Sequence, residues 1–387
     1  MTDLNKIKTP IKVNTYLMNI ENAYVSEDNI YLLNEEYEGY TSVPPVSSIF
    51  GLKGLFGAFD EKYMGYTDSG YRTKIYKFNL LEDGSIKFSK KAIVKGKTIN
   101  QFSIDEYGGE LRLAVYDDEG SRIVILDEKM QIVGETESLA EGEKMYSSRF
   151  MGEKAYLVTY KTIDPLFVVD LSDSKNPKVL GELKIPGYST YLHPYDENHI
   201  IGIGMQTEEV VRRNSSGKVI STTATITGMK MALFDVSNVK KPRQISETII
   251  GDSRTTSAIL TNHKALLFSK EKELLAIPVN NYAEDFEIEG VSENYQDMIN
   301  RYTGYNKEYI SEGYFVYKIN STEGISLKGV INHEKTKNSK YYYYDNTKLL
   351  RGLYIDNNLY TISEDYLKVN SLEDLKEISS LAIKKED

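Results

Sequence analysis

Cysteine is absent from the 387 residues of this chain. Disulfide bonds, thiolate nucleophiles, zinc–thiolate sites and iron–sulfur clusters are therefore excluded by composition. A chain without thiols suits an oxidising compartment, where a free thiol is a liability. The first residues, MTDLNKIKTP, contain no apolar segment of the signal-peptide kind. We therefore expect either a cytosolic protein or one whose export signal is not in this sequence.

Basic charge and long apolar runs are also scarce. Lysine and arginine number 47 against 57 acidic residues, which gives a net charge of −10. This balance provides no electrostatic footprint for nucleic acid or for an anionic membrane. No apolar run reaches the roughly 18 residues that a membrane span requires. We therefore expect no nucleic-acid partner and no membrane span.

Tryptophan is absent too, and almost no segment has a helical pattern. The 31 tyrosines and 12 phenylalanines favour β-strands with half-buried faces, because tyrosine tolerates one end in water. Only residues 283–299 have a helical pattern, which is acidic and weakly amphipathic. This argues against α/β folds, in which strands and helices alternate.

The chain repeats one pattern six times: a short apolar strand, a tight polar turn and a second strand. The copies begin at Asn19, Ile99, Lys144, Ser189, Thr255 and Leu349. Their turns read ED-N, YGG-E, GE-K, DE-N, TN-H and DN-N, and such residues tolerate the backbone of tight hairpins. Alternating apolar residues flank the turns, as in half-buried strands.

Most of these hairpins are followed by a second pair of strands. Two pairs share a connector, DLSDSKNP from Asp170 and DVSNVKKP from Asp235. Its aspartate can cap backbone N–H groups, and its proline stops the strand. A four-strand unit of about 45 residues has the length of a propeller blade. We predict an all-β fold, a β-propeller of four-stranded antiparallel blades, with six repeats in this chain and six to eight in the complete ring.

We predict a single β-propeller domain over residues 1–387. Inserts are expected at about 39–70, 207–227, 282–313 and 335–348. A spare strand, PIKVNTYLMN, precedes the first hairpin and either closes the ring or ends a missing blade. Aromatic residues gather at Ser48–Phe59 and Tyr341–Tyr344. They either form partner contacts or fold back over the propeller.

Long runs of this sequence resemble a family of bacterial and archaeal secreted proteins. The runs are NQFSIDEYGGELRLAV, the stretch from LAEGEKMYSSRF to DENHIIGIG, KMALFDVSN, NHKALLFSKEKELLAIPV and RGLYIDNNLYTIS. Members of this family carry a C-terminal β-propeller that is distantly related to WD-repeat proteins. The resemblance implies a propeller exported from the cell, and it implies no activity.

Polar side chains on the first strand of each blade are candidate ligand anchors, because this strand lines the channel of a propeller. The candidates are Arg149, Tyr191, His193 and Arg351. Guanidinium and phenol groups of this kind suit a small anion or a sugar. The alternative is that these side chains form hydrogen bonds that fix the geometry of the blades.

Two further groups are candidate metal sites. Acidic pairs around one hairpin could bind calcium, or act as paired carboxylates in a glycosidase; they are Asp105, Glu106, Asp117 and Asp118. The segment LHPYDENHI supplies a second set, namely His193, Asp196 and His199. The alternatives are solvated turn carboxylates and an ordinary hairpin. His263, in a predicted turn, and His333, in a charged loop, have no metal-ligand spacing.

No other cofactor and no catalytic grouping is indicated. The sequence has no G-x-S-x-G, no phosphate-binding G-K-[ST] loop and no evident Ser–His–acid set. We therefore expect a non-enzymatic binding scaffold, secreted or at the cell surface, whose partner is a protein or a glycan. Two alternatives remain open: a glycan-active enzyme with carboxylates at the channel mouth, and a purely structural module.

Overall fold

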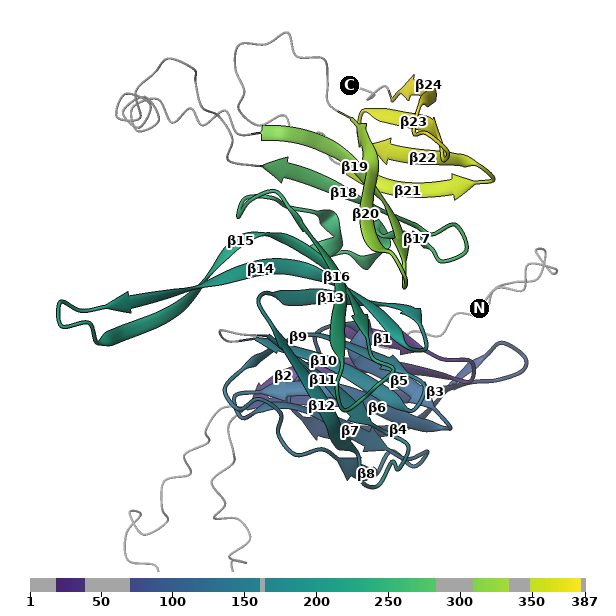
Figure 1. The fold of residues 1–387 in the computed structure, drawn as a ribbon. Helices are drawn as coiled ribbons and strands as arrows, with labels where there is room; N and C mark the ends of the chain where they lie inside the picture. The colour runs from purple at the N-terminus through teal and green to yellow at the C-terminus, as the bar shows by residue number, and fades with distance from the viewer. Residues whose placement is uncertain (1–18, 39–69, 161–163, 283–308, 334–348, 384–387) are drawn as a thin grey trace, which may run out of the picture. The chain divides into compact units, whose positions relative to one another are not determined.

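The structure is a computed structural model that describes residues 19–38, 70–160, 164–282, 309–333 and 349–383. Its strands form six four-stranded antiparallel sheets, and the strands of each sheet follow one another in the sequence (Figure 1). The predicted all-β fold with six repeats is confirmed. Within these ranges, no helix is long and apolar enough to cross a membrane.

The first three sheets lie between residues 22 and 185. The first contains β1 (Asn22–Val25), β2 (Asn29–Glu38), β3 (Gly70–Leu80) and β4 (Ile86–Lys95). The second contains β5 (Ile104–Tyr107), β6 (Glu110–Asp117), β7 (Gly120–Leu126) and β8 (Ile132–Glu135). The third contains β9 (Lys144–Met151), β10 (Lys154–Tyr160), β11 (Asp164–Asp170) and β12 (Lys178–Ile185).

The last three sheets lie between residues 188 and 382. The fourth contains β13 (Tyr188–Asp196), β14 (His199–Arg213), β15 (Val219–Asp235) and β16 (Arg243–Ile250). The fifth contains β17 (Leu267–Ser269), β18 (Leu274–Tyr282), β19 (Tyr309–Asn320) and β20 (Gly324–Asn332). The sixth contains β21 (Leu349–Ile355), β22 (Asn358–Ser363), β23 (Tyr366–Ser371) and β24 (Glu377–Ala382).

Five of the six predicted hairpins turn where the sequence places them, but the turn predicted for the fifth at Thr261–His263 is wrong. The turn of this hairpin spans residues 270–273, between β17 and β18. The preceding segment forms two 3-10 turns, η5 (Ala258–Leu260) and η6 (His263–Ala265). The side chain of Ser257 accepts a hydrogen bond from the amide of Ile259, and that of Asn262 accepts one from the amide of Lys264. These bonds cap the two turns.

Several predictions fall outside the described residues. They are the spare N-terminal strand up to residue 18, the helical pattern at 283–299, the insert at 335–348 with its tyrosines, and most of the inserts at 39–70 and 282–313. The insert at 207–227 is described, and it is a regular hairpin. β14 and β15 continue as a two-stranded ribbon beyond β13 and β16, with Thr207 opposite Ile226 and Arg213 opposite Val219 (Figure 1).

Tertiary contacts divide the chain into two compact units. Unit 1 contains Met1–Met145, Gly152–Ala155 and Val169–Val179. Unit 2 contains Tyr146–Met151, Tyr156–Val168 and Leu180–Asp387. The single domain expected over residues 1–387 stays a prediction.

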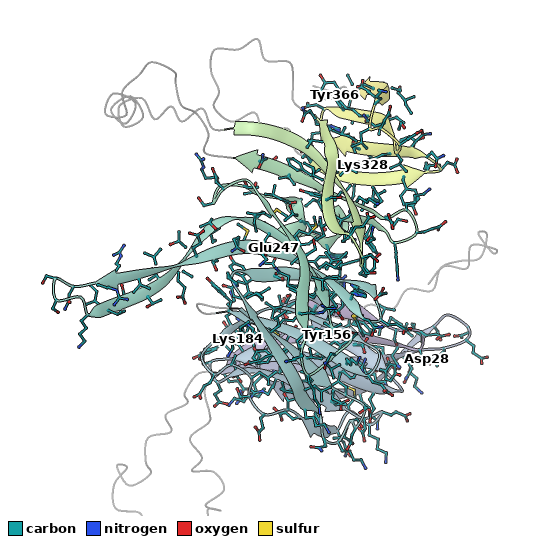
Figure 2. All side chains as sticks on the ribbon, viewed as in Figure 1. Asp28, Tyr156, Lys184, Glu247, Lys328 and Tyr366 are labelled. Atoms are coloured by element: carbon teal, nitrogen blue, oxygen red, sulfur yellow. The ribbon has the colours of Figure 1, made fainter. Side chains whose placement is uncertain are left out.

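Within each unit, consecutive sheets share buried apolar cores. In unit 1, Tyr31 of β2 and Leu113 of β6 belong to one core. In unit 2, Tyr156 of β10, labelled in Figure 2, shares a core with Phe234 of β15. A third core joins β18 and β19 to β21 and β22. Because each blade buries its apolar face against a neighbouring blade, no blade needs a core of its own.

The predicted connector forms the expected turn in both copies. The amide and hydroxyl of Ser172 donate to Asp170 Oδ1 at 3.0 and 2.7 Å. The same groups of Ser237 donate to Asp235 Oδ1 at 2.9 and 2.6 Å. Asp235 also accepts two hydrogen bonds from Arg243, at 3.0 and 2.8 Å. These hydrogen bonds hold the pKa of Asp235 at about 2.

Replacement of Asp235 by alanine is expected to lower the free energy of unfolding by about 2 kcal/mol, since hydrogen bonds to a buried charge are lost. Because its folded pKa is depressed, the carboxylate contributes above pH 4 and loses its contribution as the pH falls towards 2. Urea unfolding of Asp235→Ala measures the loss. Asp170→Ala is the matched comparison, because Asp170 binds its serine in the same way. An equal loss in both variants would show that Arg243 adds nothing.

Candidate functional site

Three of the four predicted ligand anchors lie together in unit 2. Arg149 on β9 donates from Nη2 to the hydroxyl of Tyr191 on β13, at 3.3 Å. The same hydroxyl lies 3.0 Å from Nδ1 of His193. Arg149 also donates from Nε to the carbonyl of Leu192, at 2.9 Å, and its guanidinium carbon lies 5.6 Å from the centre of the Tyr191 ring. The first strands of the third and fourth sheets therefore meet through these side chains.

Arg351, the fourth predicted anchor, lies on β21 and reaches the same region from the sixth sheet. Its Nη1 donates to the carbonyl of Lys264 in η6, at 2.8 Å. The ring of the neighbouring His263 stacks on Tyr191, with centroids 6.4 Å apart and an interplanar angle of 29°. Arg351 and Lys264 are exposed, whereas Tyr191 is buried. We call Arg149, Tyr191, His193, His263, Lys264 and Arg351 the inner-strand cluster.

β-Bulges precede two members of this cluster. The register of β13 shifts between Ser189 and Tyr191, and that of β21 shifts between Leu349 and Arg351. A bulge re-aims the side chain that follows it. At the first bulge the backbone of β14 approaches so closely that a Cβ on Gly204 would lie 1.8 Å from the carbonyl oxygen of Tyr188. Glycine at this position is therefore a condition for the bulge.

Sequence reasoning missed two parts of the site. His263 belongs to a segment predicted as a hairpin turn, and Phe268 on β17 packs edge-on against His193 with ring centroids 4.8 Å apart. The capping pattern of Ser257 and Asn262, each two residues before a bonded amide, is the signal that could have separated this segment from a hairpin.

Burial and positive charge shape the protonation states of the cluster. Burial, and after it Arg149, lowers the pKa of His193 to about 4. The pKa of His263 is lowered by burial and then by the cations Lys264, Arg149 and Arg351. Burial also lowers the pKa of Arg149, which Tyr191 partly offsets. Both histidines are consequently neutral at pH 7, and the positive charge resides on the arginines and the lysine.

This arrangement offers donors, ring faces and positive charge at one place. Guanidinium groups bind carboxylate and phosphate oxygens with charge-assisted hydrogen bonds. Tyrosine and histidine rings provide flat surfaces with polar edges, which also suit sugars. The bond from Arg149 to Leu192 connects β9 with β13, so the alternative role in fixing blade geometry holds for at least one of its donors.

The acidic pairs around β5 to β7 are engaged in hydrogen bonds and ion pairs. Asp105 accepts from Nε of Arg112 at 2.9 Å. Glu106 accepts from Ser26 Oγ at 2.6 Å and from Asn29 Nδ2 at 2.8 Å. Through these contacts, the two carboxylates connect β5 with β6 and with the first sheet.

The second acidic pair and the histidine-rich turn are arranged in a similar way. Asp117 forms an ion pair with Arg122, and Asp118 is exposed in the turn. Asp196 binds His199 Nδ1 and Lys270 Nζ, each at 2.8 Å, whereas His193 Nδ1 lies against Tyr191. In the described part of the chain, no group of three or more histidine, aspartate or glutamate side chains is placed to hold a metal ion.

The sequence placed His333 in a charged loop, and the structure shows that its side chain is buried. It directly follows β20 and is fully buried, with Nε2 at 2.7 Å from Thr361 Oγ1 and its ring against Tyr314. Burial lowers its pKa to about 4. His333 is therefore a neutral core histidine.

Two curated proteins are similar to this chain in sequence. An uncharacterised protein of Methanocaldococcus jannaschii is 36% identical over 265 residues, which cover 66% of this chain and 39% of that protein. An uncharacterised protein of Archaeoglobus fulgidus is 35% identical over 208 residues, which cover 54% of this chain and 30% of that protein. The chain spans less than half the length of these relatives.

Solved structures with some likeness include WD40 proteins. Sqt1 from Chaetomium thermophilum gives a TM-score of 0.41 at 10% identity and covers 82% of this chain and 75% of that one. The C-terminal WD40 domain of Sif2 gives 0.39 at 7% identity, with 81% and 69% covered. At these scores the likeness carries no information on function.

A family model described as a beta propeller domain matches residues 1–375. This match agrees with six consecutive four-stranded sheets, each built from strands adjacent in the sequence. The chain belongs to the beta propeller domain family.

Proposed function

We propose that this chain is a non-enzymatic binding module and that its inner-strand cluster holds a small polar ligand. The observation that supports the proposal most is the convergence of Arg149, Tyr191 and His193 from two sheets, with His263 and Arg351 beside them. First strands that bring donors and ring faces together are the usual place for a ligand in a propeller.

The burial gradient of the cluster supports the same proposal. Tyr191 is buried, with 8% of its surface exposed. Arg149 and His263 are half-buried, and Lys264 and Arg351 are exposed. A ligand that approaches from the exposed side would first meet the two exposed cations, Lys264 and Arg351, and then the more buried donors of Arg149 and Tyr191. Ordered donors bind with a smaller entropic cost than side chains that are free in solvent.

We also propose that the protein acts outside the reducing cytosol, at the cell surface or secreted. The absence of cysteine supports this compartment, as does the resemblance to exported propellers. A partner protein or a surface glycan could present the bound group. Fractionation of the native cells, followed by detection of this chain, tests the location, and a cytosolic signal alone would contradict it.

The ligand proposal is tested with four probes, glucose, glucuronate, glucose 6-phosphate and sulfate, titrated into the full chain by calorimetry. We expect at least one probe to bind. The double variant Tyr191→Phe/Arg351→Met removes the shared hydroxyl and the exposed cation. It should weaken that binding more than tenfold, or by about 1.4 kcal/mol.

Arg213→Met is the matched control. Arg213 is an exposed arginine that donates to the carbonyl of Gly217 at 3.2 Å, as Arg351 donates to Lys264, but it lies on the ribbon of β14. Its loss removes the same charge and should leave binding unchanged. Binding of no probe, or equal binding by the double variant and the wild type, would contradict the proposal.

A further inference from the structure

We infer that the inner-strand cluster is an oxyanion site that takes up a proton with its ligand: a carboxylate or phosphate group binds together with protonation of His263. This inference rests on the proposed function and specifies the class of ligand. It also states a regulation, namely that the site gains affinity as the surroundings become acidic.

The geometry around His263 carries the argument. Its ring stacks on Tyr191 of β13. Lys264 follows His263 in η6, and Arg351 on β21 donates to the carbonyl of Lys264 at 2.8 Å. Arg149 on β9 donates to the hydroxyl of the same Tyr191 at 3.3 Å. All three cations lower the pKa of His263. Tyr191 in turn contacts His193, which is neutral at pH 7. The folded chain therefore gathers three positive groups around a half-buried imidazole.

Like charges gathered at one place repel, and an anion between them relieves that repulsion. An oxyanion within reach of Arg149 and Arg351 would accept charge-assisted hydrogen bonds from both. A neutral sugar would form hydrogen bonds with the same donors but would leave the repulsion in place. Anions are accordingly favoured over neutral sugars by the charge of the site rather than by its shape.

The same electrostatics couple ligand and proton. In the free protein, burial and the three cations keep His263 deprotonated at neutral pH, since its pKa lies below the ordinary 6.5. A bound anion contributes the opposite charge and raises that pKa. Between the free and the bound pKa, binding takes up as much as one proton, so the dissociation constant falls by as much as about tenfold per pH unit on acidification.

Sulfate is the probe for the proton coupling, because its own charge does not change between pH 7.5 and 5.5. We expect the dissociation constant of sulfate to fall about tenfold from pH 7.5 to 5.5. Calorimetry in two buffers of different ionisation enthalpy should register proton uptake at pH 6.5. Glucuronate and glucose 6-phosphate, compared at each pH, distinguish a carboxylate ligand from a phosphate ligand.

His263→Gln keeps a polar side chain that cannot be protonated, and it should abolish the gain on acidification, so that the dissociation constants of sulfate at pH 7.5 and pH 5.5 become equal within about twofold. His199→Gln is the matched control, because His199 pairs with Asp196 at the end of β13 and should leave the gain intact. A gain that persists in His263→Gln overturns the inference.

Glucose separates the inference from the proposed function. Glucose binding as tight as that of the anions, and lost in Tyr191→Phe/Arg351→Met, would overturn the anion inference and leave the binding function standing. If the double variant binds every probe as tightly as the wild type does, both the anion inference and the proposed binding function are wrong. If the double variant weakens sulfate binding but the dissociation constant is the same at both pH values, the binding site stands and the proton coupling is wrong.

Discussion

Gly204→Ala is expected to lower the free energy of unfolding by about 3 kcal/mol or more. A Cβ at this position would lie 1.8 Å from the carbonyl oxygen of Tyr188 and 2.7 Å from Cα of Ser189. Both are backbone atoms, so no side-chain rotation can relieve the contact, and strand β13 must move away from β14. Because the contact lies at the bulge before Tyr191, ligand binding should weaken with stability. Urea unfolding and probe titration measure the two effects.

Gly217→Ala is the control for the general effect of replacing a glycine. Gly217 lies in the turn of the ribbon with a φ of +80° and nothing within 4 Å of an added Cβ. Its replacement should cost only about 1 kcal/mol, from the left-handed backbone alone. If Gly204→Ala cost no more than this, the close approach of β13 and β14 would have no energetic consequence.

Acidification from pH 6.5 to 4 is expected to remove about 3 kcal/mol of stability through His333. Its pKa is about 4 in the folded chain and about 6.5 when unfolded. Between these values the unfolded chain binds a proton that the folded chain does not, so stability falls as the pH falls. His193 acts in the same direction, since its pKa is also about 4. Urea unfolding at a series of pH values measures the slope.

His333→Gln isolates this contribution. The amide can still bond to Thr361, but it does not titrate, so the dependence of stability on pH should become shallower by close to one proton near pH 5. A slope in His333→Gln that equals the wild-type slope would show that His333 is not the buried titrating group.

The sequence predicted the architecture because its signals are local. Tight-turn residues such as Gly108 and Gly109 have positive φ values of 60° and 83°, and Asp170 and Asp235 form the turns read from their connectors. These features depend on a few neighbouring residues. A period-two pattern then fixes which face of each strand is apolar.

The errors concern contacts between segments far apart in the sequence. Thr255–Leu260 has the apolar pattern of a strand, but two capped 3-10 turns replace it, because Ser257 and Asn262 offer the backbone a competing hydrogen bond. His333 is polar and follows a strand end, and only Tyr314 and Thr361 make it a core residue. No local pattern records either outcome.

In the candidate site, too, the positions were predictable from local sequence signals, whereas the contacts between distant segments were not. Arg149, Tyr191 and Arg351 were predicted from their place on first strands, which the repeat defines. Their mutual distances, and the addition of His263, come from the packing of sheets in unit 2. The bulges that orient Tyr191 and Arg351 are one-residue shifts of register, which alternation patterns do not reveal.

The ribbon of β14 and β15 makes these two strands, of 15 and 17 residues, the longest in the described part of the chain. The ladder beyond Gln206 and Gly228 is separated from the blade by a shift of register, and neither β13 nor β16 extends along it. Evolution can therefore lengthen, shorten or exchange the tip without disturbing the blade below. The tip of the ribbon is therefore a position at which related chains can differ in sequence and length, and at which a foreign peptide can be inserted while the scaffold stays unchanged.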